Sequence, residues 1–237
     1  MKRVRTERGA LAAVRGGSAL ETIPVACRTA KVCFAAVRRR PCDLADVPVA
    51  LRSAEMCATA VTSDWRTLEH VPWSLRSPAI CMNAVRQDGA SLRYVPWTER
   101  TPELCLAAVK KDGTALEFVP ETLKTPALCA TAVGQDGLAL KHVPEDLKTE
   151  NLCMTAVLSW GMALTFVPDE LKTDTVCFAA IDSDPEALRH ASPRILRAAT
   201  AAALLLRSAL EWRQGVSAPR IAETIGWQDG QAAGPVQ

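Results

Sequence analysis

The sequence lacks the features that mark most enzymes, membrane proteins and secreted proteins. None of its 237 residues belongs to an apolar run of about 18, the length that a membrane-spanning helix needs. No long apolar stretch follows the basic N-terminal residues, which argues against a secretory signal peptide but leaves a specialised export signal open. It has no nucleophile elbow, phosphate-binding glycine loop, carboxylate pair or His/Cys metal spacing. These absences predict a protein that is not an enzyme and has no cofactor or metal.

A strong charge of one sign is also missing, because the net charge is only +2. A chain this close to neutral is not an obvious nucleic-acid binder as a whole. The charge is nevertheless uneven: residues 1–43 carry ten basic and three acidic side chains, a net +7 that leaves −5 for the remainder. The basic N-terminal region therefore stays a candidate for binding a polyanion.

What the sequence has instead is an internal period of 24 residues. Leucine, proline and cysteine all recur at this spacing, and the seven cysteines on it are Cys33, Cys57, Cys81, Cys105, Cys129, Cys153 and Cys177. A strict period of this length indicates a stack of small supersecondary units rather than one globular core. The fold class predicted is all-α, a solenoid of seven 24-residue helical repeats with helical caps.

These cysteines are not expected to form disulfides. Equivalent positions in stacked helices lie roughly 8–10 Å apart, whereas a disulfide needs Cα atoms closer than about 7 Å. The thiols are therefore predicted to be small buried apolar groups, as in a cytoplasmic, reducing compartment.

One repeat, residues 92–115, shows how each unit is built. Thr101 is the expected N-cap of a helix of about ten residues, and Pro102 suits its first position. Leu104, Cys105, Ala108 and Val109 are predicted to share the buried face. Gly113 is expected to end the helix in a left-handed conformation. A short helix and a proline-started turn, which is expected to be 3₁₀, complete the unit.

The ends depart from the pattern, as terminal caps should. Residues 1–19 are predicted to hold a basic capping helix, and 20–187 the seven repeats. A C-terminal capping helix is expected over 188–214, followed by a flexible tail over 215–237.

The repeat pattern AL-x-x-VP-x-x-LKT-x-x-LC-x-x-AV-x-x-DG, clearest over residues 116–137, resembles a bacterial tandem helical-repeat family of unknown function. The resemblance covers about 70% of the chain and implies a helical solenoid with no known activity. It also implies a bacterial protein, and some members look like proteins delivered to host cells.

The period is similar to that of leucine-rich repeat variant proteins too, which are associated with an N-terminal iron–sulfur cluster. Here Cys33 and Cys57 belong to the repeat, and Cys27 takes a core position. Cys42 is the one cysteine left over, and a single thiol does not hold a cluster.

A basic residue stands just before the N-cap of every repeat helix. We call these seven residues the cation row: Arg28, Arg52, Arg76, Arg100, Lys124, Lys148 and Lys172. One interpretation is a solvated edge balanced by nearby acids such as Asp88, Asp112 and Asp136. The other is a stripe that binds an anionic partner.

Two tryptophans, Trp73 and Trp97, follow the repeat proline in successive repeats. They either form an exposed apolar patch of the kind found at interaction hot spots, or lie flat on their own repeats. Arg76 and Arg100 lie three residues further on, so an aromatic–basic patch is expected there. A further periodic position holds rings that we expect to be partly buried: His70, Tyr94, Phe118, His142, Phe166 and His190.

Three functions from different classes follow from these features. The first is a non-catalytic scaffold that binds another protein through Trp73, Trp97, Arg76 and Arg100, as an effector-like or regulatory protein. The alternative is nucleic-acid or polyanion binding through the basic N-terminal region and the cation row, whose affinity should fall steeply with salt. The third is a self-assembling structural module, with an oligomeric state that the sequence does not reveal.

Overall fold

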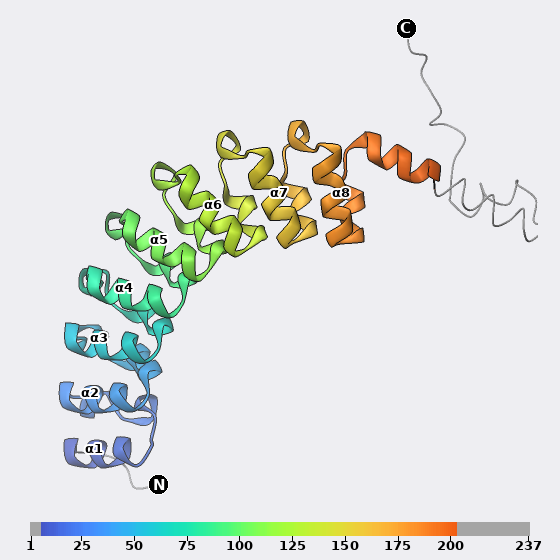
Figure 1. Cartoon of the computed structure of the whole chain (residues 1–237). Helices are drawn as coiled ribbons and strands as arrows, with labels where there is room; N and C mark the ends of the chain where they lie inside the picture. The colour runs from blue at the N-terminus through green and yellow to red at the C-terminus, as the bar shows by residue number, and fades with distance from the viewer. Residues whose placement is uncertain (1–5, 203–237) are drawn as a thin grey trace, which may run out of the picture. The chain divides into compact units, whose positions relative to one another are not determined.

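A computed structural model describes residues 6–202 of the chain, and Figure 1 shows its course. The chain divides into two compact units between His190 and Ala191. No strand occurs among the described residues, and the helices repeat regularly. The predicted fold class, an all-α repeat solenoid, is therefore confirmed. No described helix is both long and apolar enough to span a bilayer.

The first unit is built on eight α-helices that stack in chain order (Figure 1). One precedes the repeats and seven belong to them. Their bounds are α1 Glu7–Arg15, α2 Ala30–Arg39, α3 Ala54–Ser63, α4 Pro78–Gln87, α5 Pro102–Lys111, α6 Pro126–Gln135, α7 Glu150–Ser159 and α8 Asp174–Ser183.

Two 3₁₀ helices connect each α-helix to the next: both have three residues between α1 and α2, and from α2 onward a six-residue helix precedes a three-residue one. The six-residue helices are η3 Pro41–Asp46, η5 Trp65–His70, η7 Gly89–Tyr94, η9 Gly113–Phe118, η11 Gly137–His142, η13 Gly161–Phe166 and η15 Pro185–His190. The three-residue helices are η1 Leu20–Thr22, η2 Val25–Cys27, η4 Val49–Leu51, η6 Trp73–Leu75, η8 Trp97–Glu99, η10 Glu121–Leu123, η12 Glu145–Leu147 and η14 Asp169–Leu171.

The α-helices begin at the residues that the sequence predicts, and they bury the predicted faces. In α5 the Thr101 hydroxyl accepts a hydrogen bond from the Leu104 amide at 3.3 Å, so Thr101 is the N-cap. Leu104, Cys105, Ala108 and Val109 are buried. The same face recurs in each repeat, and neighbouring helices pack on it, so the core is continuous along the stack. All nine cysteines are unpaired, and the seven periodic ones, for which this was predicted, are buried.

The expected role of the repeat glycines is wrong. Gly113 does not end α5 in a left-handed conformation, because Asp112 ends that helix and Gly113 begins η9. A Cβ atom placed on Gly113 would lie 2.3 Å from the backbone oxygen of Ala132, in the next α-helix. The glycine is needed because consecutive repeats approach too closely for a side chain. Gly17, with φ 99°, is the described glycine with a positive φ.

The ends of the chain are described in part. Helix α1 lies inside the segment expected to form the N-terminal cap, while residues 1–5 lie outside the described residues. Residues 193–202 are helical in the second unit. The rest of the predicted C-terminal helix, 203–214, and the predicted tail, 215–237, also lie outside the described residues.

Candidate functional site

The repeat proline positions a line of exposed side chains along the stack. Each proline precedes a three-residue 3₁₀ helix, and the first two residues of η2, η4, η6, η8, η10, η12 and η14 form what we call the ridge. Val25, Val49, Trp73 and Trp97 head the first four of these turns and are 63–69% exposed. Glu121, Glu145 and Asp169 head the last three and are also exposed. Every head residue of the ridge therefore faces solvent, but its chemistry changes between Trp97 and Glu121.

The cation row lies directly behind the ridge and is turned inward. Arg100 is only 7% exposed. Its Nε donates to the carbonyl of Val95 at 3.0 Å, within its own repeat, and a terminal guanidinium nitrogen donates to the carbonyl of Phe118 in the next repeat. A single side chain thus joins two repeats by binding carbonyl oxygens that the 3₁₀ helices leave free.

The same bonds recur in the other repeats. Arg28, Arg52 and Arg76 each donate to one carbonyl five residues before and one 18 residues after, and to a third carbonyl seven residues before. Lys124 and Lys148 replace this fork with one ammonium group, which donates at 2.9 Å to the carbonyl 18 residues on. Six of the seven residues of the cation row thus donate to a carbonyl of the following repeat, which favours a role in holding the stack together.

The type of side chain that heads each turn of the ridge matches the type of cation-row residue behind it. The guanidinium carbon of Arg76 is 4.0 Å from the centre of the Trp73 ring, and that of Arg100 is 3.9 Å from the Trp97 ring. Burial lowers the pKa of both arginines, yet a guanidinium remains charged at neutral pH. Each indole therefore lies over an arginine of its own repeat and is still about two thirds exposed, so the exposure and the packing expected as alternatives occur together.

In the last three repeats a carboxylate takes the place of the indole. Lys124 and Lys148 bind Glu121 and Glu145 at 2.6 Å, and Lys172 binds Asp169 at 2.8 Å. The hydrogen bond from Lys172 lowers the pKa of Asp169. The lysine side chains are 5–15% exposed, whereas their carboxylate partners are 72–90% exposed. The charge exposed to solvent in these three repeats is therefore that of the carboxylates rather than that of the lysines.

The predicted partners of the cation row have a different task. The carboxylates of Asp88, Asp112 and Asp136 accept hydrogen bonds from the backbone amides two residues on, at 2.8–3.0 Å. They are N-caps of the long 3₁₀ helices, so the interpretation of a solvated edge balanced by these acids is wrong. An anion-binding stripe is no better supported, because the donors already face carbonyl oxygens.

Part of the positive charge of the basic N-terminal region is exposed to solvent. Arg38 and Arg39 are exposed in the last turn of α2. Arg40 instead lies 3.4 Å from Asp43, which is 2% exposed and accepts a hydrogen bond from the Leu20 amide. Burial raises the pKa of Asp43. This part of the basic cluster is thus partly structural.

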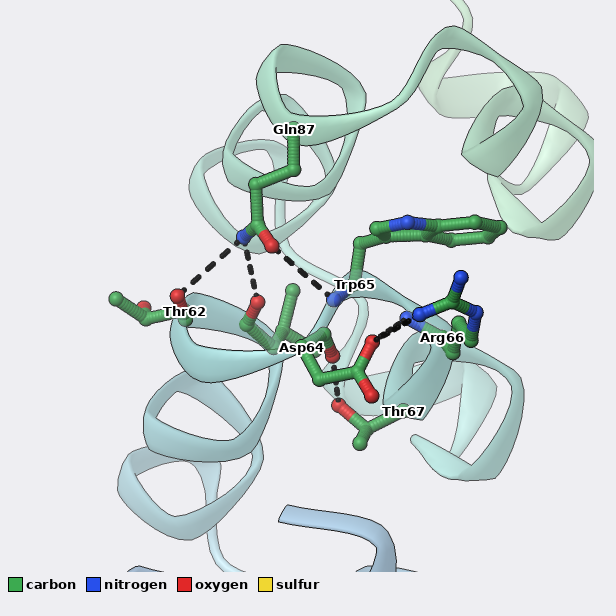
Figure 2. Close-up of polar contacts among 7 residues, drawn as sticks. Thr62, Asp64, Trp65, Arg66, Thr67 and Gln87 are labelled. Carbon is green, nitrogen blue, oxygen red and sulfur yellow. Dashed lines mark hydrogen bonds and ion pairs between the residues drawn. The ribbon is translucent and has the colours of Figure 1, made fainter.

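The joint between α3 and α4 is built differently from the later ones. Trp65 occupies the position that glycine holds in Gly89 and Gly113. Gln87 of α4 spans this joint: its oxygen accepts from the Trp65 amide at 3.2 Å, and its nitrogen donates to the Val61 carbonyl at 2.7 Å (Figure 2). A side chain of α4 therefore makes the connection at the joint where Trp65 stands in place of the glycine.

Buried thiols line the core behind these features. Burial raises the pKa of the Cys81 thiol to about 11, and raises those of Cys33, Cys57, Cys105, Cys129 and Cys153. A buried thiol with a raised pKa is a poor nucleophile. Within residues 6–202, no group of three or more His, Cys, Asp or Glu residues could hold a metal ion.

The structure adds exposed residues that sequence reasoning missed. Val25 and Val49 extend the tryptophan line, and their position in the repeat would have revealed them. Leu158 and Phe178 are 63% and 61% exposed on α7 and α8, where only the exact face of each helix could have shown it. The periodic rings are half-buried as expected, including His70, His142 and His190.

Comparison with known proteins gives one match. A family described as a domain of unknown function, DUF4116, matches residues 77–124, 101–148, 128–172 and 149–196, overlapping segments that together span 77–196. No curated protein and no solved structure matches the chain. The overlapping matches agree with the tandem repeats, and they carry no activity.

Proposed function

The chain belongs to the DUF4116 family, a domain of unknown function, and from that premise we propose that it is a non-catalytic scaffold that binds another protein along the ridge. The observation that carries this proposal is the pair of indoles, Trp73 and Trp97. They lie in successive repeats, are 63% and 66% exposed, and stack on buried guanidinium groups. Adjacent exposed apolar side chains on a folded surface favour a contact site for a partner.

Preorganisation of the two tryptophans and of the arginines beneath them favours binding. Arg76 and Arg100 are held by backbone carbonyls, and each supports an indole from below. A partner that covers such an indole gains apolar contact without paying much to order it. Tryptophan and arginine are also the residues enriched at interaction hot spots. Arg52, Lys124 and Lys148 also bind backbone carbonyls, and Lys172 pairs with Asp169; these four make no direct contact with the partner in this proposal.

The test is affinity capture from the native host, with quantitative mass spectrometry. Three baits are compared: the wild-type chain, the double variant Trp73→Ala/Trp97→Ala, and Trp160→Ala. Trp160, 38% exposed and packed on Phe166, is a matched indole away from the ridge. We expect the wild type and Trp160→Ala to retain the same specific partner and the double variant to lose it. Equal capture by all three baits would remove the ridge from consideration.

Polyanion binding remains the second candidate, favoured by the exposed Arg38 and Arg39 at the end of α2. It predicts binding to a nucleic-acid duplex that weakens steeply with salt and is lost in Arg38→Glu/Arg39→Glu. Light scattering across protein concentration addresses the third, self-assembly. A monomer at all concentrations counts against a self-assembling module.

A further inference from the structure

The ridge has two chemically distinct parts. Over the first four repeats its residues are Val25, Ala26, Val49, Ala50, Trp73, Ser74, Trp97 and Thr98, with no charged group among them. Over the last three repeats it carries five carboxylates, those of Glu121, Glu145, Asp146, Asp169 and Glu170. All of these side chains are exposed. An apolar surface therefore continues into an acidic one along the same line of turns.

Not all of the acidic charge is neutralised from below. Glu121, Glu145 and Asp169 each bind the buried lysine of their own repeat. Asp146 and Glu170 stand second in their turns and form no ion pair or hydrogen bond with any residue in the described part of the chain. The last two turns thus keep an excess of negative charge at the surface, while the first four have none.

We propose that the partner is an extended protein segment with an apolar part and an adjoining basic part. This rests on the proposed function, and it names the chemistry of the segment bound. The apolar part covers the turns from Val25 to Trp97, and lysine or arginine side chains meet the turns from Glu121 to Glu170. Charge complementarity of this kind sets the register of a bound segment and rejects acidic competitors.

The repeat spacing suits an extended chain. Stacked helices lie about 8–10 Å apart, and an extended chain in the polyproline II conformation advances about 3.1 Å per residue. About three residues of the partner therefore pass each repeat. A segment of about 20 residues would reach along the whole ridge, with one side chain in every three directed at it, because polyproline II has three residues per turn.

A displayed library of random peptides of about 20 residues, selected on the full-length chain, tests this inference directly. We expect the enriched peptides to carry apolar residues in one part, at a spacing of about three, and Lys or Arg in the other. Enrichment of acidic peptides, or of apolar peptides with no basic part, would overturn the inference. So would a library that yields no peptide dependent on the ridge.

A charge-reversal pair then locates the basic part. For an enriched peptide, fluorescence anisotropy compares the wild type with Asp146→Lys/Glu170→Lys and with the control Glu103→Lys/Glu117→Lys. The control reverses two exposed carboxylates outside the ridge, so both variants change the net charge equally. We expect about tenfold weaker binding at low salt for the ridge pair, and little change for the control.

The experiments distinguish a failure of this inference from a failure of the proposed function. Trp73→Ala/Trp97→Ala should weaken the same peptide by about 30-fold or more. Loss in the tryptophan variant with no effect of the ridge charges would overturn the partner chemistry and leave the proposed function standing. Binding indifferent to both pairs of changes would overturn the inference for that surface, and the capture experiment on the tryptophans then decides the function by itself.

Discussion

The first repeats and the last repeats satisfy the same backbone groups with different cations. Behind Trp73 and Trp97 an arginine forks to carbonyls in two repeats and stacks under the indole. Behind Glu121 and Glu145 a lysine reaches the next carbonyl and pairs with the carboxylate. A planar guanidinium matches a ring, and a compact ammonium matches a carboxylate. The cation therefore keeps its contact with the next repeat in both regions, while the ridge residue in front of it changes.

A second difference between the regions concerns the joints. In the later repeats Gly89, Gly113, Gly137 and Gly161 let backbones meet. At the α3–α4 joint Trp65 stands in that position and Gln87 makes the connection. Close packing and a side-chain bridge therefore replace each other at equivalent places, and each should be sensitive to a different substitution.

The largest effect is expected for Gly113→Ala. The added methyl group would meet the Ala132 oxygen, a backbone atom that cannot turn away, so we expect a loss of about 3 kcal/mol in the free energy of unfolding. Gly134→Ala is the matched control, because nothing lies within 4 Å of its Cβ position in α6. There we expect a gain of about 0.5–1 kcal/mol from helix propensity. Urea unfolding measures both, and equal effects would contradict the close-approach argument.

The cation row gives the next effect. Arg100→Met and Lys124→Met keep an unbranched stem and remove the donors. Arg100 serves two carbonyls and Lys124 one. We therefore expect losses in the free energy of unfolding of about 2 kcal/mol for the arginine and about 1 kcal/mol for the lysine. Urea unfolding of both variants checks the order. An unchanged stability in both would show that the row does not hold the repeats together.

The Gln87 bridge should matter less. Gln87→Ala removes hydrogen bonds across the α3–α4 joint, and we expect a loss of about 1 kcal/mol in the free energy of unfolding. Gln135 occupies the same position in α6, where the joint contains Gly113, and it is exposed. Gln135→Ala should change stability by less than about 0.5 kcal/mol. If both glutamines behaved alike, the contrast between the joints would fail.

The smallest effect concerns pH. Burial lowers the pKa of His142 from 6.5, so the folded chain disfavours its protonation. The corresponding stability is present above pH 6.5 and is lost as the pH falls through the lowered pKa. His142→Phe, which places there the ring found at Phe118 and Phe166, should remove this loss. Thermal melts of both proteins between neutral and mildly acidic pH measure it. A constant difference between the two curves would contradict the prediction.

Sequence reasoning reached the architecture because it depends on local signals. The period placed α5, the Thr101 cap and the buried Cys105 correctly, since each follows from residues a few positions apart. It placed Trp73 and Trp97 in one surface position without deciding between exposure and packing. It did not predict that Val25 and Val49 extend the apolar surface, because aliphatic side chains are less conspicuous than indoles at the same repeat position.

The number of layers, the helix that each contributes and the face that each buries follow from the sequence alone. The direction of the Arg100 side chain, and the reason why Gly113 must lack a side chain, follow only from the folded stack. Both depend on atoms of the following repeat, the carbonyls of Phe118 and Ala132. Periodicity says which residues are equivalent, but a hydrogen bond or a backbone contact between layers exists only once the layers are stacked at a definite distance.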